Sequence, residues 1–248
     1  EYNPVIYAYH SDIESNYMNG TVNTPDGWSQ DEWAIWLDSY CVVSDNEVIG
    51  FGSGIRADHD NDNEIIGNNI EVRHYGVYMP NSNGNHVIED NTFRHYTTET
   101  GHRMIYVTDP SHVSIHNNEI YSQGQDGVYI ANTNVTMARN LIVTMRDGLE
   151  LTNEVGGTVL NNTIVSTDGG ETGIKVSNLS TPVMRNNIVQ GFETGMQIDN
   201  DLMNTNVSHN ALWNISGEQY TGTALAPLIG EQLSFNANSD SSDVYGNI

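Results

Sequence analysis

The stretch that decides the fold is 112-HVSIHNNEIYSQGQDGVYIANT-133. It contains three short apolar alternations, each followed by turn residues: Val113/Ile115, Asn118/Ile120 and Val128/Ile130. Alternation over a few residues indicates a short, half-buried strand. A segment of this size cannot bury its apolar face alone, so the stretch predicts that copies of itself stack on both sides.

Copies of one part of the stretch occur along most of the chain. The shared pattern is an apolar residue, an Asn three positions later and an apolar residue two positions beyond. It is found at Ile13/Asn16/Met18, Val43/Asn46/Val48, Ile65/Asn68/Ile70, Ile88/Asn91/Phe93, Ile115/Asn118/Ile120, Met137/Asn140/Ile142, Val159/Asn162/Ile164, Val183/Asn186/Ile188 and Val207/Asn210/Leu212. The repeat length of about two dozen residues, without a segment long enough for a helix, is typical of a β-solenoid.

A second pattern, apolar-x-apolar and usually preceded by Gly, lies between these copies. It is found at 6–8, 35–37, 55–57, 77–79, 105–107, 128–130, 149–151, 174–176 and 196–198. We expect the apolar residues to point inward and the Asn side chains to bond from rung to rung, at about the 4.8 Å spacing of paired strands.

The Asn repeat and the Gly-apolar-x-apolar strands resemble the right-handed parallel β-helix of the pectate-lyase-like superfamily, over about residues 5–214. We therefore expect an all-β, right-handed parallel β-helix of nine to ten rungs over residues 1–214. Residues 215–248 are expected to form a C-terminal tail, packed on the solenoid or donated to a neighbour. The resemblance implies that the sheet built from the second pattern carries the substrate cleft.

Composition limits the partners. The net charge is −24, with 8 basic and 32 acidic residues, which argues against a nucleic-acid partner. No stretch has the roughly 18 apolar residues of a membrane span, and no signal peptide is visible at Glu1. The charge suits an extracellular or cell-surface setting. The single Cys41 lies in an apolar alternation and is expected to be buried and inert.

The middle residue of each second-pattern strand should point outward, and stacking should align these residues in one file. The file is Tyr7, Trp36, Arg56, Tyr78, Tyr106, Tyr129, Glu150, Lys175 and Gln197. Gly precedes many of these strands and would leave a bare lane beside the file, unless it serves turn geometry alone. A lane lined by aromatic rings suits an extended polysaccharide, so Tyr7, Trp36, Arg56, Tyr78, Tyr106 and Gln197 are candidate substrate-binding residues.

Six candidate catalytic residues lie on consecutive rungs: Asp126, Tyr129, Arg146, Asp147, Glu150 and Lys175. A lyase needs a cation or metal beside a uronate carboxylate and a base, roles open to Lys175, Arg146 and Tyr129. A glycosidase needs two carboxyl groups, which Asp126, Asp147 and Glu150 could supply. The alternative is that Glu150 and Lys175 form an exposed cross-strand ion pair of little energetic effect.

A second candidate site lies in residues 58–64, where acidic residues alternate as in a calcium loop: Asp58, Asp60, Asp62 and Glu64. Ca²⁺ binds several carboxylate oxygens from a tight turn. Asn63 stands where such loops have Gly, and Asn69 where they have Glu. A solvated acidic turn is the alternative.

Two functions follow as hypotheses. One is an extracellular polysaccharide-binding β-helix, a lyase or hydrolase of an acidic glycan that uses the outward file. The other is a non-catalytic structural protein of a cell-surface layer or filament, assembled end to end through open solenoid ends. Whether the protein is an enzyme is left open by the sequence.

Overall fold

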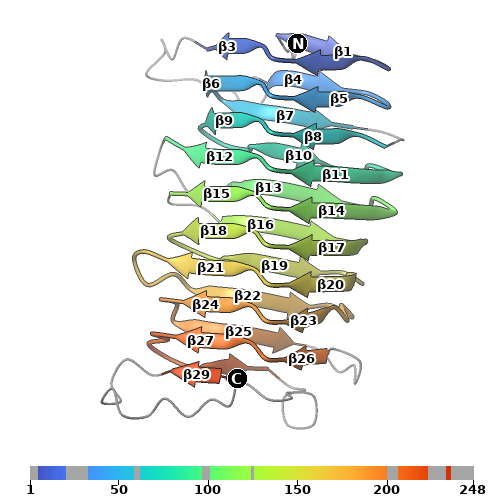
Figure 1. Cartoon of the computed structure of the whole chain (residues 1–248). Coiled ribbons are helices and arrows are strands. Elements are labelled where there is room, and N and C mark those ends of the chain that lie inside the picture. The colour runs from blue at the N-terminus through green and yellow to red at the C-terminus, as the bar shows by residue number, and fades with distance from the viewer. Residues whose placement is uncertain are drawn as a thin grey trace.

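The computed structural model describes residues 5–20, 33–58, 62–96, 101–123, 126–199, 206–222 and 233–235. Over these ranges the chain is a parallel β-helix whose coils stack from the N-terminal to the C-terminal end (Figure 1). The strands form three sheets, here named A, B and C, and each described coil before the last contributes one strand to each sheet. The fold expected from the sequence is confirmed.

The strands of each sheet pair in parallel, in chain order. Sheet A contains β1 (Ile6–Ala8), β4 (Trp33–Leu37), β7 (Ser53–Ala57), β10 (Val77–Met79), β13 (Arg103–Thr108), β16 (Asp126–Ala131), β19 (Leu149–Thr152), β22 (Thr172–Ser177), β25 (Thr194–Asp199) and β28 (Tyr220–Thr221). Sheet B contains β2 (Asp12–Glu14), β5 (Val42–Ser44), β8 (Glu64–Ile66), β11 (Asn85–Glu89), β14 (His112–His116), β17 (Asn134–Ala138), β20 (Gly156–Leu160), β23 (Val183–Arg185) and β26 (Asn206–Ser208). Sheet C contains β3 (Tyr17–Asn19), β6 (Glu47–Phe51), β9 (Asn69–Val72), β12 (Thr92–His95), β15 (Glu119–Ser122), β18 (Leu141–Thr144), β21 (Thr163–Ser166), β24 (Ile188–Gln190), β27 (Ala211–Trp213) and β29 (Leu233–Phe235).

The described coil makes about eight turns, slightly fewer than the nine to ten rungs predicted from the repeats. One turn is the step between two stacked rungs, and within the described residues the last rung is represented by strands in sheets A and C. Those two strands, β28 and β29, pair with β25 and β27 and lie beyond residue 214.

The core is a narrow column of apolar side chains from all three sheets. Ile105 and Val107 of β13 are fully buried, whereas Tyr106 between them is half-buried on the outer face. The period-two alternation that predicted strands therefore also sets which residues face the core. Cys41 is 1% exposed and free, as expected.

The Asn ladder lies at the corner between sheets B and C. Asn118 is typical, because its Nδ2 donates to Asn140 Oδ1 at 3.0 Å and to the Ile88 carbonyl at 2.8 Å. Its Oδ1 accepts from the backbone N–H and the Nδ2 of Asn91, both at 3.0 Å. The ladder predicted from the repeat is thus confirmed as a chain of buried amides.

One rung of the predicted ladder was wrong by one residue. Asn187, not Asn186, receives the bond from Asn162, at 3.0 Å. Asn186 instead occupies the corner that precedes each ladder residue, with φ of 57°, like Asn117 at 55°. Consequently Val189 is buried and Ile188 is 44% exposed. The Asn-Asn doublet satisfies the pattern in two registers, and only the preceding turn decides between them.

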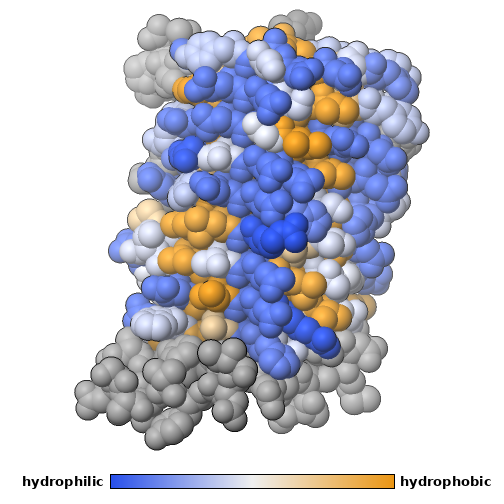
Figure 2. Space-filling view, in the orientation of Figure 1, coloured by the Kyte–Doolittle hydropathy of each residue, from blue (hydrophilic) through white to orange (hydrophobic). Residues whose placement is uncertain are grey.

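The surface formed by sheets B and C is largely hydrophilic, with separate apolar patches (Figure 2). Trp213 on β27 is one of the exposed apolar side chains, at 51%. The described part of the chain has no helix suited in length and apolarity to crossing a membrane.

Candidate functional site

Sheet A aligns the predicted outward file in register from β1 to β25. Each member pairs with the next: Tyr7↔Trp36, Trp36↔Arg56, Arg56↔Tyr78, Tyr78↔Tyr106, Tyr106↔Tyr129, Tyr129↔Glu150, Glu150↔Lys175 and Lys175↔Gln197. The prediction that these side chains stack in one file is therefore confirmed.

The glycine lane expected beside the file is not an open surface. Gly127 is buried, and a Cβ there would lie 2.5 Å from the Gly148 carbonyl oxygen and 2.6 Å from Ile142 Cγ2. A Cβ added at Gly54, Gly148 or Gly173 would likewise meet a glycine carbonyl oxygen and an aliphatic side chain. Glycine is required here because the backbones and the core approach closely, so these residues give no groove floor.

The central tyrosines form a stacked ladder along the helix axis. The ring centroids of Tyr78 and Tyr106 lie 5.0 Å apart, as do those of Tyr106 and Tyr129, whose planes differ by 4°. Because these ring faces cover each other, a bound sugar would meet ring edges and phenol hydroxyls. This differs from the expectation that the sugar stacks on ring faces.

Two aromatic residues that the sequence analysis missed extend this ladder. Trp33 stacks on Tyr75 at 6.1 Å and on Tyr78 at 5.5 Å. Both missed residues stand three positions before a member of the file: Trp33 before Trp36 and Tyr75 before Tyr78. This spacing marks a second row of residues, at or just before the first residue of the sheet A strands, whose side chains pack beside the file.

The same row supplies Arg103, which the sequence analysis also missed. Arg103 stands three positions before Tyr106, as Asp126 stands before Tyr129. Its Nη2 lies 3.6 Å from Glu150 Oε2, and its guanidinium lies 4.5 Å from the Tyr129 ring centre. Arg103 therefore joins the tyrosine ladder to the charged rungs below it.

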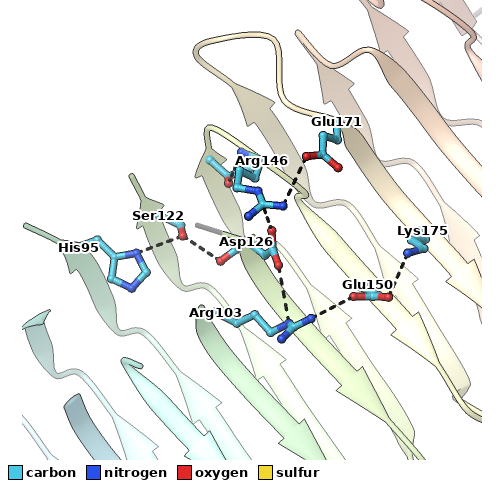
Figure 3. Close-up of polar contacts among 9 residues, drawn as sticks. His95, Arg103, Ser122, Asp126, Arg146, Glu150, Glu171 and Lys175 are labelled. Carbon is cyan, nitrogen blue, oxygen red and sulfur yellow. Dashed lines mark hydrogen bonds and ion pairs between the residues drawn. The ribbon is translucent and has the colours of Figure 1, made fainter. Parts of the chain in front are cut away.

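Four of the predicted catalytic residues, Asp126, Arg146, Glu150 and Lys175, join one network of ion pairs with Arg103 (Figure 3). Lys175 Nζ lies 3.3 Å from Glu150 Oε1, and the Nε atoms of Arg103 and Arg146 each lie 3.8 Å from an Asp126 oxygen. Arg146 also reaches Glu171 at 3.4 Å. Glu150 and Lys175 are thus part of a larger cluster, and not an isolated exposed pair.

Two carboxyl groups of the cluster occupy neighbouring rungs at the start of β16 and β19. The N–H of Gly127 donates to the Asp147 carbonyl at 2.8 Å, which places Asp126, the first residue of β16, and Asp147, two residues before β19, on adjacent rungs. Burial raises the pKa of Asp126, against the lowering effect of Arg103 and Arg146. Burial and the neighbouring Asp126 charge raise the pKa of Asp147 to about 6.

A buried histidine–serine pair lies behind Asp126. Ser122 Oγ donates to the Asp126 carbonyl at 2.8 Å and lies 3.2 Å from His95 Nδ1. His95 Nε2 in turn contacts the His74 carbonyl, and burial lowers the pKa of His95 to about 4. At neutral pH this pair holds the backbone of Asp126 without adding charge to the cluster.

The remaining predicted binding residues lie toward the two ends of the file. Tyr7 is 60% exposed, and its hydroxyl donates to Asp38 Oδ2 at 2.8 Å. The Arg56 guanidinium lies 4.3 Å from the Trp36 ring centre. Gln197 Nε2 donates to Asp199 on its own strand.

The predicted calcium loop is only partly described, because Asp60 lies outside the described residues. Asp58 Oδ2 lies 2.6 Å from Arg56 Nε, and Asp62 Oδ1 accepts from the Asn85 N–H at 2.7 Å. Among the described residues, no group of three or more His, Cys, Asp or Glu side chains gathers as a metal site. The calcium site therefore stays a prediction.

The chain forms stacked coils whose strands make three parallel sheets, with a buried Asn ladder and a charged and aromatic outer face. These features define a protein of the parallel β-helix class. A family model described as a right-handed β-helix region matches residues 33–170 and 97–229. The chain therefore belongs to the right-handed β-helix family, a fold consistent with polysaccharide-related proteins. Searches of curated proteins and of solved structures find no match.

Proposed function

We propose that the protein is an extracellular polysaccharide-binding β-helix that hydrolyses glycosidic bonds on the outer face of sheet A. The observation that carries the proposal is the pair Asp126 and Asp147, two partly buried carboxyl groups on adjacent rungs with raised pKa values. Glycoside hydrolysis commonly needs two such groups in different protonation states.

Asp147 is the proposed general acid, because its pKa of about 6 keeps part of it protonated near neutral pH. Asp126 is the proposed nucleophile: burial raises its pKa, and the neighbouring Arg103 and Arg146 oppose that rise. The two residues lie on adjacent rungs, and Asp147 Oδ1 accepts the Thr172 N–H at 2.9 Å, which fixes the orientation of this carboxyl group. We propose the retaining course because that mechanism uses two carboxyl groups that lie close together.

In the first step, an Asp126 oxygen attacks the anomeric carbon while the bond to the leaving oxygen breaks. Asp147 gives its proton to that oxygen. In the second step, Asp147 takes a proton from water, whose oxygen attacks the anomeric carbon and releases Asp126. After the second step, Asp126 is again a free carboxylate and Asp147 is again protonated. Neither step requires a cofactor.

The lyase alternative needs Lys175, Arg146 or Tyr129 to act as a base. Lys175 and Arg146 are each engaged by a carboxylate, at 3.3 and 3.4 Å. Burial raises the pKa of Tyr129 further above its usual value of 10.0, and the nearby Glu150 charge adds to the shift. A neutral phenol and two paired cations are poor bases, so hydrolysis is the better supported reaction.

The experiment incubates the full chain with a panel of neutral and acidic polysaccharides and measures new reducing ends, together with ultraviolet absorbance from unsaturated products. We expect reducing ends without absorbance, and a rate that falls above about pH 6 as Asp147 loses its proton. Asp147→Asn should lower the rate by about 10²-fold or more, whereas Glu47→Gln on sheet C should not. Unsaturated product would favour the lyase, and the absence of any product would refute catalysis.

The alternative function is a non-catalytic component of a cell-surface layer or filament. It is supported by exposed aromatic side chains near the first rungs, since Tyr7, Tyr9 and Tyr17 are each about 60% exposed. Exposed apolar clusters often mark contact surfaces. Size-exclusion chromatography over a concentration series tests this function, and a monomer at every concentration would contradict it.

A further inference from the structure

The cations beside sheet A are all matched by carboxylates. The whole chain has 8 basic residues, and four of them border this sheet. Arg56 pairs with Asp58 at 2.6 Å, and Lys175 pairs with Glu150 at 3.3 Å. Arg103 and Arg146 have carboxylate partners too, at 3.6 and 3.4 Å. Each of these four cations is paired with an acid, so a further anion would meet a positive charge that is already largely balanced.

The proposed catalytic centre carries no excess of positive charge. Three cations, Arg103, Arg146 and Lys175, face four carboxyl groups: Asp126, Asp147, Glu150 and Glu171. The net charge is −1 when all seven groups are ionised, and zero when Asp147 holds the proton of the proposed general acid. The net charge of −24 on the whole chain adds long-range repulsion of a polyanion.

Two buried polar atoms of this network make no hydrogen bond within the described part of the chain. Arg103 Nε and Asp126 Oδ1 are buried, and neither makes a hydrogen bond among the described residues. The gaps of 3.8 Å from Asp126 to Arg103 and to Arg146 are too long for direct hydrogen bonds. A sugar hydroxyl can accept from the guanidinium and donate to the carboxylate, a role open to neutral and acidic sugars alike. The additional carboxylate of a uronate can only accept, and beside Asp126 it would meet a group of like charge.

From this we infer that sheet A selects an uncharged sugar chain, recognised through its hydroxyl groups, in preference to an acidic glycan. The inference rests on the proposed function and names the substrate class for the same site. The edges and hydroxyls of Tyr78, Tyr106 and Tyr129 would contact neighbouring sugar units, because their ring faces cover each other.

The test uses matched pairs of polysaccharides, each an acidic chain and its carboxyl-reduced, uncharged form. The three pairs are polygalacturonate with its galactan, polymannuronate with its mannan, and a glucuronan with its glucan. Titration calorimetry with the full chain should show at least about tenfold tighter binding of one or more uncharged chains. That binding should change little with salt, because it does not depend on exposed charges.

Two results separate this inference from the proposed function. Tighter binding of an acidic chain, weakened by salt, would overturn the inference and leave glycan binding in place. An absence of binding and of reducing ends across all pairs would overturn both.

Variants test the physical cause. Glu150→Gln removes the carboxylate shared by Arg103 and Lys175. It should improve binding of the acidic chains about two- to fivefold at low salt, as expected for partly exposed ion pairs. Glu47→Gln on sheet C makes the same change in net charge and should have no such effect.

Lys175→Met gives a second measurement that does not depend on the folding of the first variant. Since Lys175 is already paired with Glu150, we expect the preference for the uncharged chain over its acidic partner to be kept. A loss of acidic-chain binding in Lys175→Met, with no gain in Glu150→Gln, would show that Lys175 recognises an anion and would overturn the inference.

Discussion

Replacement of one ladder amide tests whether the buried Asn ladder holds the coils together. In Asn118→Ala, two hydrogen bonds donated by Nδ2 and two accepted by Oδ1 are lost. Asn118 is 1% exposed, so water cannot readily replace these partners, and the Ile88 carbonyl loses this buried donor. At about 1 kcal/mol for each net hydrogen bond, with a further penalty for buried groups left unsatisfied, we expect a loss of about 3–5 kcal/mol.

The assay is urea unfolding of the full chain, followed by far-ultraviolet circular dichroism. The matched control is Asn134→Ala at the exposed start of β17, where a surface substitution should change stability by no more than about 0.5 kcal/mol. If Asn118→Ala and Asn134→Ala unfold within about 1 kcal/mol of each other, the ladder does not stabilise the fold as argued.

Three further predictions concern charge, packing and metal binding. Asp147 has a pKa raised from 3.8 to about 6, so its unfavourable charge appears in the fold as pH rises through this range. Asp147→Asn should therefore be more stable than the native chain at pH 8 by about 1–2 kcal/mol after allowance for solvent screening, with the difference absent below pH 4; an equal difference at both values would contradict this. Gly127→Ala should cost about 1–3 kcal/mol in urea unfolding, since its Cβ would meet the next rung's backbone at 2.5 Å, whereas Gly156→Ala meets the movable Asn134 side chain and should cost less. If the acidic loop 58–64 binds calcium, calcium should raise the melting temperature, and Asp62→Asn should reduce that rise. An identical melting temperature with calcium and with chelator would show that this loop does not bind calcium.

Much of the fold could be predicted from the sequence because a solenoid repeats a local pattern. The alternation around Ile105 and Val107 and the recurrent Asn determine which side chains face the core, and stacking carries that choice from rung to rung. The file from Tyr7 to Gln197 follows from the same period-two geometry. The predicted ladder was wrong only at Asn186-Asn187, where the local pattern fits two registers.

Tertiary structure decided what the aligned side chains do. Arg103 contacts Glu150 across rungs although it lies 47 positions earlier in the chain, a contact with no local sequence pattern. The mutual stacking of Tyr106 and Tyr129 and the burial that raises the pKa of Asp147 also arise only when rungs are superposed. The sequence by itself determined the β-helix and the order of its outward residues. The charge balance of the site was decided in three dimensions, because ion pairing and desolvation depend on neighbours from different coils.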